Sequence, residues 1–78
     1  MTGVVLIFGV SGFVGGYLAK EFCSFGYKVY GCDISESSDI ADQVTFIPCD
    51  ILDQVQVRKV ISETKPMYIV AVSYTHLT

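Results

Sequence analysis

The feature that most constrains the fold of this chain is a set of three glycines directly after a short apolar segment. Residues 4–8 read Val-Val-Leu-Ile-Phe. Gly9, Gly12 and Gly15 then follow at intervals of three residues. An apolar run without alternation predicts a strand that is buried on both faces. The glycines allow the chain to turn off this strand and begin a helix, whose N-terminal amides suit an anion such as a phosphate.

Each of these glycines has its own expected part in a phosphate-binding turn. Gly9 permits a sharp turn off the strand, Gly12 lets a pyrophosphate approach the backbone, and Gly15 lets the helix lie close against the sheet. A P-loop is excluded, because no Gly-Lys-Ser/Thr follows the turn. The motif alone leaves open a glycine-rich turn that binds no ligand.

The remainder of the chain predicts an α/β fold built on a parallel sheet. A helix with a buried stripe of Val14, Leu18, Phe22 and Phe25 is expected after the glycines. Further strands are expected at residues 28–33, 44–47 and 67–71, with a serine-rich loop after the second strand and one helical turn at most in 39–43.

A second helix is expected to begin at Asp53, since Asp53 and Gln56 fit a capping box. Its predicted apolar stripe is Val57, Val60 and Ile61, and Lys65-Pro66 ends it. With short connections and right-handed crossovers, these elements predict the N-terminal half of a Rossmann doubly wound parallel sheet, in the strand order 3-2-1-4.

Two acidic residues follow predicted strands at the edge where such sheets bind dinucleotides. Asp33 ends the second strand about 20 positions after the glycines, where a carboxylate holds the ribose hydroxyls. Asp50 follows the third strand and has two interpretations. It accepts from an adenine amino group, with the Ile51 backbone beside the ring, or it is a turn aspartate that bonds its own backbone.

Composition narrows the classes of partner. Hydrophobic residues make up 51% of the chain and the mean hydropathy is +0.52, which is too apolar for a disordered segment. No apolar run reaches the length of about 18 residues that a membrane span needs, and no basic segment precedes residues 4–8 as in a signal peptide. A net charge of −3 argues against nucleic acid.

The three cysteines follow no metal-binding spacing, so no metal site is expected. Cys32 and Cys49 fall near the ends of two neighbouring predicted strands, and we expect buried thiols there rather than a disulfide. These observations together predict a cytoplasmic protein without a membrane or nucleic-acid partner.

The glycine motif, Asp33 and the segment 49–53 (Cys-Asp-Ile-Leu-Asp) resemble the extended short-chain dehydrogenases/reductases. Within these, they resemble the NAD-dependent epimerase/dehydratase group that acts on nucleotide sugars. Residues 9–35 are most similar to GDP-mannose 4,6-dehydratases and GDP-4-dehydro-6-deoxymannose reductases, and UDP-glucose 4-epimerases are similar in the same stretch. The resemblance covers residues 1 to about 71 and implies an NAD cofactor, a nucleotide-sugar substrate and a homo-oligomeric parent protein. NAD is expected rather than NADP, because Asp33 would repel a 2′-phosphate and residues 34–36 offer no arginine or lysine to neutralise one.

The resemblance also implies roles for individual residues. Asp33 would hold the adenosine ribose, and Asp50 and Ile51 would face the adenine. Phe13 and Val14 are also expected to pack under the turn. The residues implied around the pyrophosphate are Gly9, Gly12, Gly15 and the backbone of Ser11, Phe13 and Val14.

The chemistry of this family requires a Tyr-x-x-x-Lys pair with a nearby Ser or Thr. None of the tyrosines in this chain has a lysine four residues further on, so we expect no catalytic residue here. A dinucleotide-sensing regulator without that pair is the alternative to an enzyme. An anion-binding module without a cofactor is disfavoured by Asp33 and Asp50 together.

The last seven residues, Val-Ser-Tyr-Thr-His-Leu-Thr, depart from the family pattern. The codons GTC TCT TAT ACA CAT CTG ACG of a common transposon-end sequencing adapter encode them. We therefore expect an NAD(P)-binding Rossmann half-domain at 1–71 and an adapter-derived tail at 72–78, with His76 neither a metal ligand nor a base. The alternative is a divergent strand end.

Overall fold

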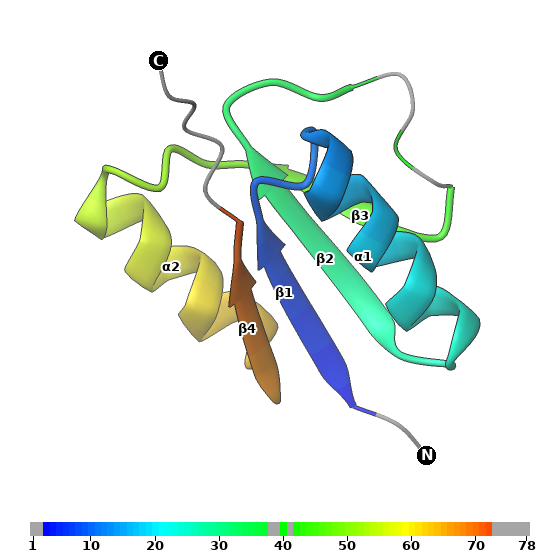
Figure 1. Cartoon of the computed structure of the whole chain (residues 1–78). Helices are drawn as coiled ribbons and strands as arrows, with labels where there is room; N and C mark the ends of the chain where they lie inside the picture. The colour runs from blue at the N-terminus through cyan, green and yellow to red at the C-terminus, as the bar shows by residue number, and fades with distance from the viewer. Residues whose placement is uncertain (1–2, 38–39, 41, 73–78) are drawn as a thin grey trace.

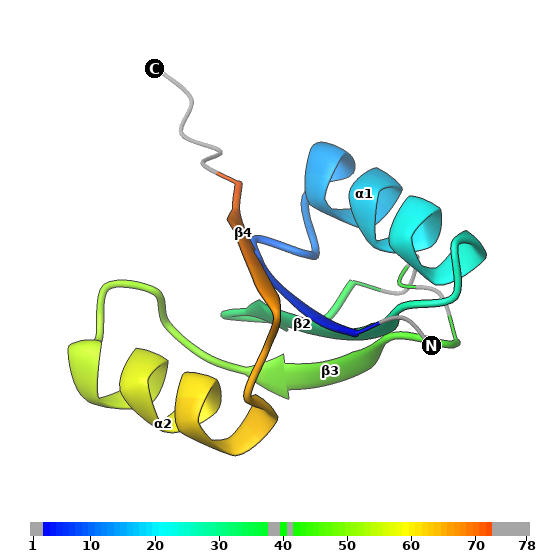
Figure 2. The same cartoon turned by 90° about the horizontal axis from the view of Figure 1, so that it is seen from below.

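The computed structural model describes residues 3–37, 40 and 42–72. Within these described residues, four parallel strands form one sheet, with one helix on each of its two faces (Figures 1 and 2). The strand order β3-β2-β1-β4 confirms the predicted Rossmann half-sheet. The elements are β1 (Val4–Phe8), α1 (Phe13–Ser24), β2 (Lys28–Asp33), β3 (Thr45–Pro48), α2 (Gln54–Thr64) and β4 (Tyr68–Ala71).

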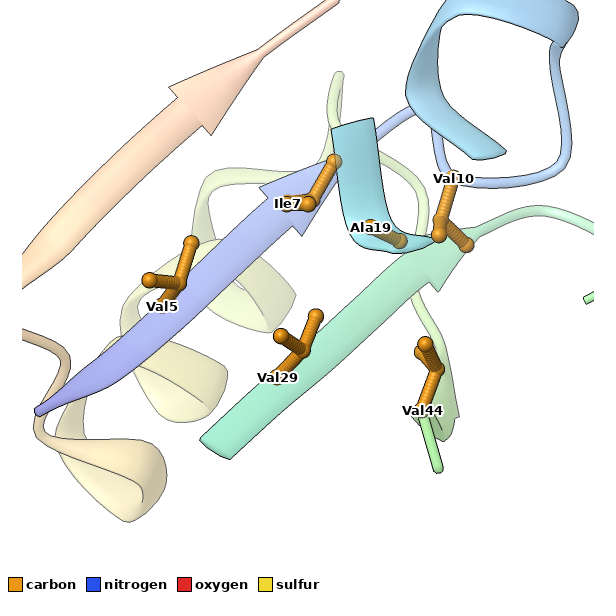
Figure 3. Packing of buried hydrophobic residues seen from close by; sticks show 6 residues of the cluster. All are labelled: Val5, Ile7, Val10, Ala19, Val29 and Val44. Atoms are coloured by element: carbon orange, nitrogen blue, oxygen red, sulfur yellow. The ribbon is translucent and has the colours of Figure 1, made fainter. Parts of the chain in front are cut away.

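The core lies on both sides of β1, which pairs with β2 and β4. Because successive side chains of a strand point to opposite faces, Val5 and Ile7 join one buried cluster and Leu6 and Phe8 the other. The first cluster lies between the sheet and α1, and Ala19 of that helix belongs to it (Figure 3). The predicted burial of this strand on both faces is confirmed.

The edge strands differ slightly from the predicted ranges. β3 begins one residue later than expected and includes Pro48, which an edge strand tolerates because one side of it lacks a ladder partner. β4 begins at Tyr68, and the Val72 amide continues its pairing by donating to the Phe8 carbonyl at 3.0 Å. The expected helical turn at 39–43 lies partly outside the described residues.

The stripe predicted for α1 is wrong in half of its members. Val14 and Phe25 are 53% and 69% exposed, whereas the buried residues of the helix are Gly15 and Ala19. Small residues occupy the contact line because the helix backbone lies close to the turn and sheet, and this rotates Val14 outward. Leu18 and Phe22 pack against the core as predicted.

The helix α2 agrees with the sequence pattern. Val60 is buried, and Val57 and Ile61 pack against the second cluster. The helix ends at Thr64, and the following residue, Lys65, has a φ of 48° and precedes proline. In the part of the chain that the structure describes, neither helix is long and apolar enough to cross a membrane.

Candidate functional site

The turn between β1 and α1 lies at the carboxyl edge of the sheet, beside the end of β2 (Figure 1). Gly9 leaves β1 with a φ of 89°, a backbone region that favours glycine. The amides of Gly9 and Val10 both donate to the Cys32 carbonyl, at 2.8 Å and 3.2 Å. These two bonds tie the turn to the neighbouring strand.

Gly15 is required by the packing of α1 against this turn. A Cβ at Gly15 would overlap the Gly9 carbonyl oxygen and lie 2.8 Å from its carbon and 3.0 Å from the Val10 Cα. These neighbours are backbone atoms, which cannot rotate away. The close approach of α1 that was predicted at Gly15 is therefore present, but at this residue the helix lies against the backbone of the turn rather than against the strands.

Gly12 differs, because nothing in the described protein requires a glycine there. A Cβ would lie 3.5 Å from the Gly9 carbonyl oxygen, an ordinary contact, and the φ of −79° suits any residue. The following amides, of Phe13, Val14 and Gly15, donate to no acceptor among the described residues. A Cβ at Gly12 would fill space beside these donors, so the turn fits a ligand with anionic oxygens.

Asp33 at the end of β2 is bonded to the same turn. Its carboxylate accepts from the Ser11 amide at 3.0 Å through Oδ2 and from the Ile34 amide at 2.8 Å through Oδ1. Its carbonyl accepts from the Cys49 amide at 3.0 Å, beyond the end of β3. The structure thus brings the predicted phosphate turn and the predicted ribose carboxylate into direct contact.

Two contacts of this turn were not expected from the sequence. The Ser11 hydroxyl bonds to the segment after Asp33, and the Val10 side chain fills the space above Gly31. A Cβ at Gly31 would lie 2.6 Å from Val10 Cγ2. The signal for this second contact was present, since a glycine inside a strand indicates close approach by another group.

The expectation that Phe13 and Val14 pack under the turn is wrong. The Phe13 side chain is 91% exposed, and Val14 is 53% exposed. Both residues begin α1 on the side away from the contact line of Gly15 and Ala19. Their predicted contribution of backbone amides to the site stays a prediction.

Asp50 adopts the turn arrangement that was one of its two interpretations. Its Oδ1 accepts from the Leu52 amide at 2.9 Å, and its own amide donates to Gln56 Oε1 at 2.9 Å. The predicted adenine contact of Asp50 and Ile51 stays a prediction. The Ile51 side chain is 48% exposed and lines a shallow surface hollow with Arg58.

Asp53 caps α2 as predicted, although the capping box is incomplete. Asp53 Oδ1 accepts from the amides of Val55 and Gln56, at 3.0 Å and 3.3 Å. The Gln56 side chain does not return to the Asp53 amide, which donates to the Asp50 carbonyl at 2.9 Å instead. Gln56 therefore joins the helix cap to the turn at Asp50.

Cys32 and Cys49 are buried neighbours with free thiols, as predicted. Burial, with the adjoining Cys49 thiol and Asp33 as smaller contributors, raises the pKa of Cys32 to about 12. Burial likewise raises the pKa of Cys49. Among the described residues, no group of three side chains gathers that could hold a metal ion.

A glycine turn at the first βα crossover, with a carboxylate ending the next parallel strand, defines the class of Rossmann dinucleotide-binding folds. A model of the NAD dependent epimerase/dehydratase family matches residues 5–76. The chain therefore belongs to the NAD dependent epimerase/dehydratase family. Membership confirms the predicted cofactor class, NAD, since dependence on NAD defines this family.

Solved structures show the same fold. The Bordetella bronchiseptica enzyme WbmH, in complex with NAD+, is 24% identical with a TM-score of 0.86, and the match covers 100% of this chain and 28% of that one. UDP-glucose 4-epimerase from Brucella ovis, in complex with NAD, is 24% identical with a TM-score of 0.87, and the match covers 97% of this chain and 24% of that one. A putative epimerase from Burkholderia cenocepacia is 28% identical with a TM-score of 0.78, and the match covers 91% of this chain and 25% of that one. The chain thus spans about a quarter of the length of these proteins.

Proposed function

We propose that residues 1–71 bind the adenosine diphosphate half of NAD as the cofactor-binding part of a longer nucleotide-sugar enzyme. The observation that carries this proposal is the contact between the Ser11 amide and the Asp33 carboxylate, which unites phosphate turn and ribose carboxylate in one site. The open side of Gly12 supports it, since a Cβ there would obstruct a pyrophosphate and nothing else.

In this proposal the chain's own residues bind and orient the cofactor. The amides at the start of α1, from Phe13 to Gly15, donate to the pyrophosphate, and Asp33 accepts from the ribose hydroxyls. Asp50 and Ile51 lie toward the adenine. When bound, NAD supplies a hydride acceptor. The acid/base pair that would act on the sugar belongs to sequence beyond residues 1–71.

The proposed cofactor is NAD rather than NADP. Asp33 repels a 2′-phosphate, and the following residues, Ile34, Ser35 and Glu36, offer no cation to neutralise one. Steady-state kinetics of the full-length protein that contains this chain should show a preference for NAD. A tenfold preference for NADP would contradict this assignment.

For the reaction we propose GDP-mannose 4,6-dehydration first, on the resemblance of residues 9–35 to those dehydratases. UDP-glucose 4-epimerisation is the second candidate, because solved structures with this fold include UDP-glucose 4-epimerases. Reduction of a GDP-sugar ketone is the third. The full-length protein is further proposed to be a cytoplasmic homo-oligomer.

The test is incubation of the full-length protein with NAD and a panel of nucleotide sugars, followed by mass spectrometry and chromatography. Loss of one water from GDP-mannose supports the first reaction, and isomerisation of UDP-glucose without a change of mass supports the second. NAD binding without turnover of any nucleotide sugar would favour a dinucleotide sensor instead. Absence of NAD binding would refute the proposed function.

Residues 72–78 are proposed to be adapter-derived and to take no part in this function. The codon match supports this interpretation, whereas the match of the family model extends to residue 76. Residues 73–78 lie outside the described residues. Amplification of the locus from source DNA tests it. The same seven codons followed by open coding sequence of the family would overturn it.

A further inference from the structure

The side chain of Ser11 makes contacts that the proposed phosphate role of the glycine turn does not use. Its hydroxyl donates to the Ser35 carbonyl oxygen at 2.5 Å and accepts from the Ser37 amide at 3.1 Å. Its amide donates to the Asp33 carboxylate at 3.0 Å. One residue of the turn therefore contacts three residues of the segment 33–37, which leaves the end of β2.

These contacts matter because apolar burial contributes little to holding that segment. Ile34 is 71% exposed, and Ser35 and Glu36 are exposed as well. A hydroxyl can donate and accept at the same time, and both capacities of Ser11 are used here. Alanine at this position would leave the Ser35 carbonyl and the Ser37 amide without this partner.

The orientation of the Asp33 carboxylate depends on the path of the same segment. One carboxylate oxygen accepts from the Ser11 amide, and the other accepts from the Ile34 amide at 2.8 Å. A change in the path of residues 34–37 therefore moves the Ile34 amide, which is one of the donors that orient the carboxylate. The Ser11 hydroxyl opposes such a change, because it bonds to the Ser35 carbonyl and the Ser37 amide of the same segment.

We propose that the Ser11 hydroxyl is a positioning residue for the ribose-binding carboxylate. It fastens residues 35–37 against the glycine turn and so keeps Asp33 oriented to accept the hydroxyls of the adenosine ribose. This inference rests on the proposed function, because it requires the ribose to bind at Asp33. It assigns the side chain of Ser11 a role separate from that of its backbone.

The test compares Ser11→Ala with Ser11→Thr, which keeps a hydroxyl, in the full-length protein. Ser24→Ala is the matched control, since that hydroxyl also donates to a backbone carbonyl, Glu21 at 2.8 Å, but at the far end of α1. Calorimetry measures the affinities for ADP and for 2′-deoxy-ADP, and their ratio reports the contact with the ribose hydroxyl. Hydrogen exchange of a peptide that contains Ser37 reports the fastening directly. Ser11→Cys, close in size and weaker in hydrogen bonding, replaces Ser11→Ala if that variant does not fold.

We expect the wild type to prefer ADP by about tenfold, as for a hydrogen bond to a charged group. Ser11→Ala should reduce this preference at least about threefold and speed exchange at Ser37, whereas Ser11→Thr and Ser24→Ala should retain both wild-type values. An unchanged preference in Ser11→Ala, with a wild type that binds ADP, overturns this inference alone. A wild type that binds neither nucleotide overturns the proposed function and this inference together.

Discussion

The contact between Gly15 and the turn makes a quantitative prediction. Replacing Gly15 by alanine places a Cβ that overlaps the Gly9 carbonyl oxygen and lies 2.8 Å from its carbon. Replacing Gly16 by alanine places a Cβ at an ordinary 3.5 Å from the Val10 carbonyl oxygen. The two glycines are adjacent in α1, so the pair separates the effect of the overlap from that of the helix.

The magnitude follows from two opposing terms. Alanine is favoured over glycine within a helix by up to about 1 kcal/mol, and this gain applies to both variants. Overpacking costs about 1–3 kcal/mol, and more where the neighbour is backbone. Gly16→Ala should therefore be neutral or stabilising by up to about 1 kcal/mol, and Gly15→Ala should be less stable than Gly16→Ala by about 1–3 kcal/mol.

Urea denaturation of the full-length protein measures the difference, with the free energy of unfolding obtained by linear extrapolation for each variant. Equal slopes in the two variants would show that the comparison concerns the folded state. If Gly15→Ala is as stable as Gly16→Ala, α1 does not lie against the turn as described, and the reasoning is refuted.

Four further predictions concern the site and its supports. Gly12→Ala should cost less than about 1 kcal/mol of stability, since its Cβ makes only an ordinary contact, 3.5 Å from the Gly9 carbonyl oxygen. It should weaken NAD binding at least about tenfold by calorimetry, and unchanged affinity would contradict the assigned phosphate site. Asp33→Asn should narrow the preference for NAD over NADP by about tenfold in steady-state kinetics, equivalent to about 1.4 kcal/mol of charge repulsion; an unchanged preference would show that Asp33 does not face the 2′ position. Asp53→Ala should lower the free energy of unfolding by about 1 kcal/mol in urea, because Asp53 Oδ1 accepts two amides of the first turn of α2; no loss would show that this cap is not formed. Burial raises the pKa of Cys32 from 9.0 to about 12, so the thiol ionises at lower pH in the unfolded chain than in the folded one. The free energy of unfolding of the wild type should therefore fall as pH rises through this interval, and it should fall less steeply in Cys32→Ala. The same fall in both proteins would contradict the burial of this thiol.

The sequence was informative where a local requirement selects the residue type. The positive φ at Gly9, the buried contact of Gly15 and the uniform apolar run of β1 each leave a trace in the residues themselves. The parallel order of the strands followed from short connections and the handedness of crossovers. Asp33 was recognised because the end of β2 reaches the same edge as the glycine turn.

The sequence was less informative about which side of α1 faces the sheet. Helical spacing selected Val14 and Phe25 because they are large and apolar, yet these side chains are exposed. The actual contact line contains Gly15 and Ala19, since close approach of two backbones requires small residues. Hydrophobic periodicity does not detect such a face, because its buried residues are small and carry little apolar side chain.

The sequence by itself thus determined the elements, their parallel order and the glycine turn between β1 and α1, because these depend on local residue patterns and on the lengths of the connections. Only the tertiary structure decided which of these residues meet. The Ser11 hydroxyl reaches Ser35 and Ser37, more than 20 residues away, because β1 and β2 lie side by side and end at one edge. No periodicity or local propensity encodes that contact, since it exists only once the sheet has formed.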